Sequence, residues 1–143
     1  RVFGCDDCLA ICPWNKFAVA ARETRLALKP DLDAPDLAQL AGLDDAAFRT
    51  FFASTPIKRA GRDRFLRNVL IAIGNSGSLR LADAARPLLD DASPLVRVAA
   101  VWALARLLPA GEVRSLAADA LTRESDPDVR DEWKHAMETE PCA

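Results

Sequence analysis

Apolar residues recur at helical spacing along most of the chain, and proline, glycine, serine and aspartate interrupt them at short intervals. Alanine, leucine and arginine are abundant while β-branched residues are few, a composition that favours helices over strands. The pattern therefore predicts an all-α protein. In the first part of the chain it predicts helices over 15–28 and 34–40, the latter closed by Gly42, and a third that Asp44 caps and that runs to Phe52.

From Arg62 onward the chain repeats itself, because residues 66–74, 96–104 and 129–137 align with Arg67, Arg97 and Arg130 at one position. Ser-Pro and Asp-Pro precede the second and third units as helix starts, and residues 79–89 and 113–122 read as partner helices. This resembles HEAT-type helical repeats stacked as a short solenoid. We expect Arg97 and Arg130 to be part of the scaffold.

The helix over 95–108 is apolar almost all round, so it is predicted to be the central helix with neighbours on both sides. Trp102 and Leu104 are expected to lie in the core. If Trp102 fills that core, its replacement by alanine should cost about 3–5 kcal/mol.

The chain has 143 residues, enough for one domain with a real core, and half of them are hydrophobic. Charged residues make up 28%, with a formal net charge of −2, as in an ordinary globular protein. No apolar run is long enough to cross a bilayer, so we expect no membrane role. The chain begins with Arg1, which suggests a truncated or excised N-terminus.

Three cysteines near the start of the chain have the spacing of iron–sulfur ligands. Cys5, Cys8 and Cys12 form the pattern C-x2-C-x3-C-P, which matches the last three cysteines of the bacterial run C-x2-C-x2-C-x3-C-P. Val2 stands where the first cysteine would be. On this pattern Cys5 and Cys8 share one [4Fe–4S] cluster and Cys12 reaches a second. Two clusters need about eight thiolates, four each, so the missing ligands must lie outside this chain.

Zinc binding and disulfide formation are the alternative roles of these cysteines. A structural zinc site would need a second pair of ligands, but His135 and Cys142 stand alone near the end of the sequence. A disulfide framework is typical of short secreted chains, whereas here the cysteines are bunched and no apolar signal segment precedes them. Clustered thiolates that bind metal favour a reducing cytoplasm.

A basic segment, residues 57–67, leads into the first repeat helix. It carries five cations against one acid, Asp63, in a chain that is acidic overall. Such a concentration is the electrostatic footprint of a polyanion-binding site, although a solvated helix start paired with the acidic stretch 31–45 would look the same. The candidate nucleic-acid contacts are Lys58, Arg59, Arg62, Arg64 and Arg67.

Several runs together resemble the epoxyqueuosine reductase family. They are GCDDCLAICPWN at 4–15, STPIKRAGR at 54–62, FLRNV at 65–69 and GNSG at 74–77. The resemblance covers this chain nearly end to end, but only the C-terminal part of the family's architecture. It implies removal of the epoxide oxygen of epoxyqueuosine in the tRNA anticodon region, the last step of queuosine synthesis.

The resemblance also implies two [4Fe–4S] clusters and a cobalamin, with the cobalamin pocket and the catalytic acid upstream of this sequence. It divides the chain into the C-terminal part of a ferredoxin-like segment (1–28), a helical linker region (29–61) and HEAT-like repeats (62–143). We expect a cytoplasmic monomer without catalytic residues in this piece, inactive alone and with an unknown electron donor. The alternatives are a two-cluster electron-transfer protein with a HEAT-type docking module and a zinc-bearing HEAT-type scaffold.

Overall fold

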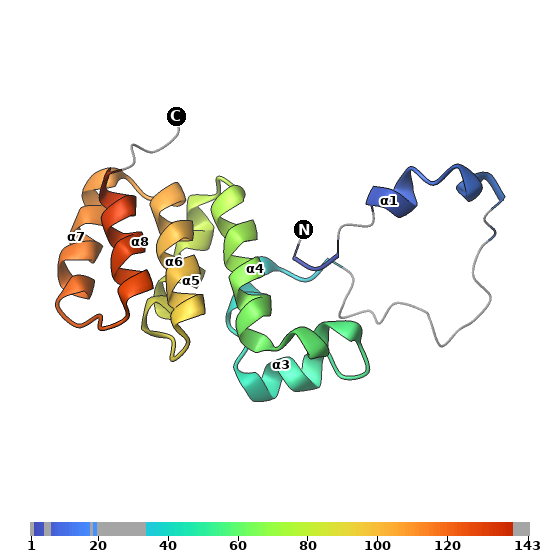
Figure 1. The fold of residues 1–143 in the computed structure, drawn as a ribbon, viewed down its shortest axis with the longest axis horizontal. Coiled ribbons are helices and arrows are strands. Elements are labelled where there is room, and N and C mark those ends of the chain that lie inside the picture. Colours follow the sequence, from blue (N-terminus) through green and yellow to red (C-terminus); the bar gives the residue numbers. More distant parts are fainter. Residues whose placement is uncertain (1, 5–6, 18, 20–33, 139–143) are drawn as a thin grey trace.

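In a computed structural model of the protein, residues 2–4, 7–17, 19 and 34–138 are described. Every regular element within these ranges is a helix, which confirms the predicted all-α class. Figure 1 shows α4, α6 and α8 side by side in a row, while α1 lies apart from it. With η for a 3₁₀ helix, the elements are α1 (Asp7–Ala10), η1 (Pro13–Phe17), α2 (Leu37–Ala41), α3 (Asp45–Phe51), η4 (Pro56–Ala60), α4 (Arg62–Asn75), η5 (Leu79–Leu81), α5 (Ala82–Ala85), η6 (Arg86–Asp90), α6 (Pro94–Leu107), α7 (Ala110–Leu121) and α8 (Pro127–Glu138).

Aspartate caps begin the two short helices that precede the row. The carboxylate of Asp44 accepts a hydrogen bond of 2.7 Å from the N–H of Ala47, which confirms the predicted cap of α3. Asp36 does the same for α2, so that helix starts at residue 37 rather than 34. The predicted helix over 15–28 lies largely outside the described residues, and its first residues belong to η1.

The helix α6 lies between α4 and α8 and packs against both (Figure 1). Its buried side chains point in several directions, as predicted for a helix with neighbours on two sides. Alanines supply half of them, which lets adjacent helices approach closely. The buried residues of α6 are Val96, Ala99, Ala100, Val101, Ala103 and Leu104.

The expectation that Trp102 is a core residue is only partly right, because its ring is partly buried at the edge of the core. It packs over α4, and the guanidinium of Arg106 lies 5.3 Å from the centre of its ring. Leu104 is buried as expected. The tryptophan that fills the core is Trp133 of α8, which is 2% exposed, so the large cost of truncation to alanine belongs to Trp133.

Residues 79–89, predicted as one partner helix, form the three short elements η5, α5 and η6. Pro87 explains the break, because it has no N–H to donate and its ring collides with the carbonyl one turn back. The partner helix predicted over 113–122 is present as α7, which packs against α8.

Gly74 of α4 lies where this helix packs tightly against α6. A Cβ atom at this position would lie 2.6 Å from Cζ3 of Trp102 and 3.0 Å from Cα of Ala103. We expect Gly74→Ala to overpack the interface and lower the free energy of unfolding by about 1–3 kcal/mol. Chemical denaturation measures this change.

Gly111→Ala is the matched control, since Gly111 is also helical and a Cβ there would meet nothing within 4 Å. It should be neutral or stabilising by up to about 1 kcal/mol. Equal effects of the two substitutions would contradict a tight contact at Gly74.

Candidate metal centre and nucleic-acid interface

Cys8 and Cys12 lie on the two sides of a tight turn. Cys8 is in the single-turn helix α1 and is exposed, while Cys12 precedes Pro13, the first residue of η1, and is partly exposed. Both are free thiols. Cys5 lies outside the described residues. Within the described part of the chain, no cluster of three or more His, Cys, Asp or Glu residues could hold a metal ion.

Asn15 holds this turn together. Its side-chain amide donates to the carbonyl oxygens of Leu9 and Ala10, at 2.5 and 3.4 Å, and its own N–H donates to the carbonyl of Cys12. The N–H of Cys12 in turn donates to the carbonyl of Leu9 at 3.2 Å. These bonds fix the backbone on both sides of Cys12, so its thiol is presented from a closed turn.

Four apolar residues close in sequence to the two cysteines are exposed. Leu9, Ile11, Trp14 and Phe17 are all more than 60% exposed, and the rings of Trp14 and Phe17 lie 5.6 Å apart. The donors themselves are thiols, which suit a soft metal or an iron–sulfur cluster better than a hydrated hard cation.

The basic segment is held in place by aromatic packing beneath it. Phe48 and Phe52 of the α3 region pack against Phe65 of α4, with ring centres 4.7 to 5.4 Å apart. The chain between them forms η4 and turns into α4 at Gly61, whose φ of +80° is a conformation that favours glycine.

Three of the predicted nucleic-acid contacts are exposed, and together they form what is called the basic surface below: Lys58, Arg59 and Arg64. Lys58 and Arg59 lie on η4 and Arg64 in the first turn of α4, and none of the three forms an ion pair with a described residue. Lys58 and Arg59 line one side of an open hollow of about 570 Å³ whose other walls are Ser54, Thr55 and Pro56. Cations, hydroxyls and an open concave surface are a combination that can bind phosphate groups.

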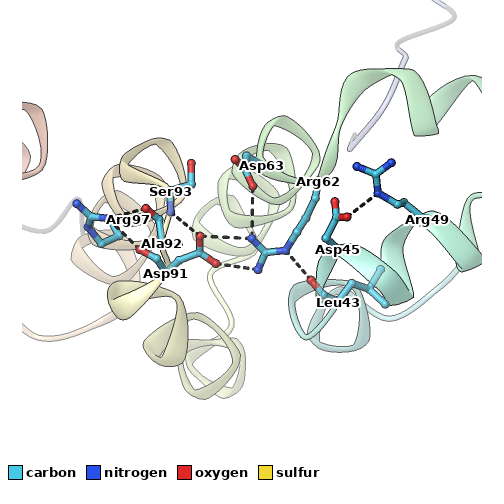
Figure 2. Close-up of polar contacts among 9 residues, drawn as sticks. All are labelled: Leu43, Asp45, Arg49, Arg62, Asp63, Asp91, Ala92, Ser93 and Arg97. Carbon is cyan, nitrogen blue, oxygen red and sulfur yellow. Dashed lines mark hydrogen bonds and ion pairs between the residues drawn. The ribbon is translucent and has the colours of Figure 1, made fainter.

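Arg62, another of the predicted nucleic-acid contacts, is largely buried and bound to protein partners. Figure 2 shows its guanidinium pointing back into the helical row, where it binds both carboxylate oxygens of Asp91 at 2.7 and 3.3 Å. It also donates to the carbonyl of Leu43, and its side chain is only 18% exposed. The predicted partner was the acidic stretch 31–45, but the ion pair is with Asp91. Arg62 therefore ties α4 to the loop before α6.

Arg97 and Arg130 make the corresponding links further along, consistent with their expected scaffold role. Arg97 binds both oxygens of Glu124 at 2.8 and 2.9 Å and also the carbonyl of Asp91 (the latter in Figure 2). Arg130 donates to the carbonyls of Leu121 and Glu124. The loops before α6 and α8 are thus both bound by arginine side chains.

The acidic partners of these arginines were not predicted, although the sequence contains a signal for them. Asp91 and Glu124 each stand three residues before the proline that starts a helix, Pro94 and Pro127. Each carboxylate also accepts the backbone N–H two residues on, at 2.9 Å.

Arg67, aligned with Arg97 by the repeat, is half-buried and has a different partner. Its guanidinium binds the side-chain oxygen of Asn68, at 3.3 Å from Nε and 3.0 Å from Nη2. In the first unit it is therefore Arg62 rather than the aligned Arg67 that reaches the next loop.

Both acids of these links titrate below their ordinary range. For Asp91, burial alone would raise the pKa, but the hydrogen bonds from Arg62 and from the N–H of Ser93 outweigh it and lower the pKa. For Glu124 the hydrogen bond from Arg97 is the main cause of a lowered pKa. Their contribution to stability is therefore present above the unfolded-state pKa values of about 3.9 and 4.3 and is lost as pH falls further.

We expect the free energy of unfolding to be nearly flat from neutral pH to about pH 5 and to fall below about pH 4. Asp91→Asn should lower it by about 1–3 kcal/mol at pH 7, because Arg62 loses a charged partner, and should make the acid limb shallower. Denaturant titrations at a series of pH values measure both effects.

Asp83→Asn is the control for this prediction, because the Asp83 side chain is 90% exposed. It should change the free energy of unfolding at pH 7 by no more than about 0.5 kcal/mol. An acid limb that is equally steep in Asp91→Asn and in the unmodified protein would contradict the role of the Arg62–Asp91 pair.

No protein-family model matches the chain, but known proteins have similar sequences. A protein named epoxyqueuosine reductase from Alicycliphilus denitrificans is 42% identical over 116 residues, covering 74% of this chain and 32% of that protein. One of the same name from Xanthomonas campestris pv. campestris is 44% identical over 107 residues, covering 74% of this chain and 30% of that protein. The chain spans about a third of the length of these relatives.

Solved structures share the fold. A crystal structure of epoxyqueuosine reductase with an epoxyqueuosine-modified tRNA-Tyr stem loop superposes with a TM-score of 0.87 at 23% identity, covering 96% of this chain and 37% of that one. A Bacillus subtilis epoxyqueuosine reductase gives the same values. The fold is thus that of an all-helical segment found within larger proteins. By sequence, the chain is a homologue of the epoxyqueuosine reductases.

Among the described residues, no helix is long and apolar enough to span a membrane.

Proposed function

We propose that this chain is the C-terminal part of an epoxyqueuosine reductase, supplying iron–sulfur ligands and a surface for the tRNA substrate. The sequence match carries the proposal, because relatives of that name are 42% and 44% identical over about three quarters of the chain. The cysteine run would supply the cluster ligands, and the exposed cations would contact the tRNA.

Cys5, Cys8 and Cys12 are the thiolates that would hold the clusters. Cys8 and Cys12 are free and accessible on a turn that Asn15 closes, which suits their use as ligands. When bound, the clusters supply single electrons. Removing an epoxide oxygen as water consumes two electrons and two protons, so a relay of two one-electron centres matches the demand of the reaction. The family resemblance assigns the cobalamin to other parts of the protein, and no described residue is assigned to it.

Lys58, Arg59 and Arg64 are the residues that would contact the tRNA backbone. All three are exposed and carry like charge, and Lys58 and Arg59 line one open hollow, whereas Arg62 and Arg67 are engaged with protein partners. Contacts of this kind position an RNA without reading its sequence. A related protein of known structure is described with a tRNA-Tyr stem loop, which supports tRNA as the partner.

The paired helices from α4 to α8 support HEAT-like repeats as the scaffold of this surface. Two antiparallel partners, α7 and the broken element η5–α5–η6, flank the row α4, α6 and α8. In such a stack each unit contacts chiefly its neighbours. We propose that the protein acts as a cytoplasmic monomer, as expected of a tRNA-modifying enzyme that relies on reduced thiolates.

The deciding experiment is turnover by the intact protein of tRNA that carries epoxyqueuosine, with cobalamin and a low-potential reductant, followed by nucleoside analysis. Queuosine should form only when both cobalamin and the clusters are present. Iron and sulfide without any turnover would instead favour the two-cluster electron-transfer protein. Zinc without iron would favour the scaffold.

The cysteines should belong to different clusters. Cys8→Ser and Cys12→Ser in the intact protein should each lose the EPR signal of one reduced cluster, and not the same one, because the cysteine before proline crosses over to the other cluster. Loss of the same signal in both variants would contradict the crossover. Ser93→Ala, remote in sequence from the cysteines, is a control that should keep both signals.

The salt dependence of tRNA binding tests the basic surface. Arg59→Ala combined with Arg64→Ala should weaken binding and lower the slope of log K against log salt by up to about 1.4, at roughly 0.7 for each single-strand phosphate contact. The melting temperature should stay nearly unchanged, because both side chains are exposed.

Arg114→Ala combined with Arg123→Ala makes the same charge change at the α7 end of the row, far from η4 (Figure 1). This control should leave the slope near that of the unmodified protein. Equal slopes for the two double variants would show that net charge alone, and not this surface, drives binding.

A further inference from the structure

A hydrogen bond joins the start of the chain to the first helix of the row. The side-chain Nδ2 of Asn68, in α4, donates to the backbone carbonyl of Val2 at 3.0 Å, across 66 positions of sequence. Val2 is itself partly buried against the core. Val2 lies three residues before Cys5, so this contact fixes the backbone immediately ahead of the cysteine run.

Arg67 determines which way the Asn68 amide points. Its guanidinium has only donors and binds Oδ1 of Asn68 with both Nε and Nη2, so the amide oxygen must face Arg67. The amide nitrogen then faces Val2, where a carbonyl can only accept. Only one orientation of the Asn68 amide satisfies both Arg67 and Val2, so this side chain links the two specifically.

Asn68 also shares a face of α4 with the basic surface. Residues four apart on a helix are neighbours, so Asn68 stands one turn after Arg64. One face of one rigid helix thus carries an exposed arginine at its start and the attachment of the cysteine segment a turn later. The other side of α4 is buried against the core through Phe65, Leu66 and Val69.

We propose that Asn68 is a positioning residue that anchors the cluster-binding segment to α4, and so sets its place relative to the tRNA-contacting arginine. This inference rests on the proposed function for its iron–sulfur and tRNA parts. The anchor itself is a contact between described residues. It acts on the backbone that leads into Cys5 and touches neither cluster nor substrate.

Asn68→Asp tests the anchor because it replaces only the amide nitrogen of the side chain with an oxygen. It keeps the acceptor that faces Arg67, but it replaces the donor to Val2 with an oxygen that repels the carbonyl. Asn75→Asp is the matched control, with the same chemical change on an exposed residue at the end of the same helix. Arg67→Ala is a second variant that keeps Asn68 but frees its amide to turn, and its effect should be smaller.

Hydrogen–deuterium exchange of the intact protein is the first measurement. In Asn68→Asp, peptides from residues 2–17 should exchange roughly two- to twelve-fold faster than in Asn75→Asp, the range expected for loss of one hydrogen bond. Peptides from α6 serve as an internal reference and should not change, which separates release of the segment from unfolding of the row. Equal exchange of 2–17 in the two variants, or an equal rise in α6, overturns the proposal.

The cluster itself gives the second measurement, which a purely structural contact would not move. In Asn68→Asp the EPR signal of the cluster assigned to Cys5 and Cys8 should shift, and iron should be lost to a chelator faster than in Asn75→Asp. If the protein holds iron and sulfide but the two variants have identical spectra and rates, Asn68 does not position the cluster. If the unmodified protein holds no iron, the proposed function fails instead.

Discussion

The structure depends on one helix having neighbours on both sides. Because α6 packs against α4 and α8 at once, its side chains must be small where the backbones approach, and they must be apolar nearly all round. This requirement explains its alanines and the glycine opposite it at position 74, where Trp102 leaves no room for a Cβ atom. The two elements that present the exposed basic residues are attached to this helix, α4 by direct packing and η4 through α4.

Aromatic packing extends this order to the candidate RNA surface. Phe48, Phe52 and Phe65 fix α3 against α4, so the loop between them has to close within a few residues. That loop carries Lys58 and Arg59 outward, because its inward face is already filled. Packing therefore determines that these two positive side chains lie on the outer side of the loop.

Much of the helical architecture could be predicted from sequence, since periodicity and caps are local signals. The cap at Asp44 and the ends of α6 follow from short patterns, whereas Pro87 interrupts a helix that apolar spacing alone favoured. The tryptophans were harder, because Trp102 lies in the largely apolar α6 and Trp133 in the charge-rich α8, and yet packing buries Trp133 more deeply.

The types of residue in the candidate site could be predicted from sequence, but which of the cations are exposed could not. Five cations in one segment look alike in sequence, and yet Arg62 is bound to an aspartate 29 positions away. Such long-range pairing depends on how the row of helices brings loops together. The cysteines are the opposite case, since their spacing alone suggests their chemistry, whereas the Asn68 contact to Val2 left no pattern to recognise.

Asp91 receives the side chain of Arg62 through its carboxylate and that of Arg97 through its backbone carbonyl. One residue thus accepts from two successive helices of the row. In a row of packed helices in which each contacts chiefly its neighbours, the strength of coupling between neighbours decides whether they melt singly or together. Because Asp91 binds arginines of both α4 and α6, it increases the coupling between these helices without enlarging their contact area. The cooperativity of unfolding therefore depends on these hydrogen bonds as well as on the apolar core.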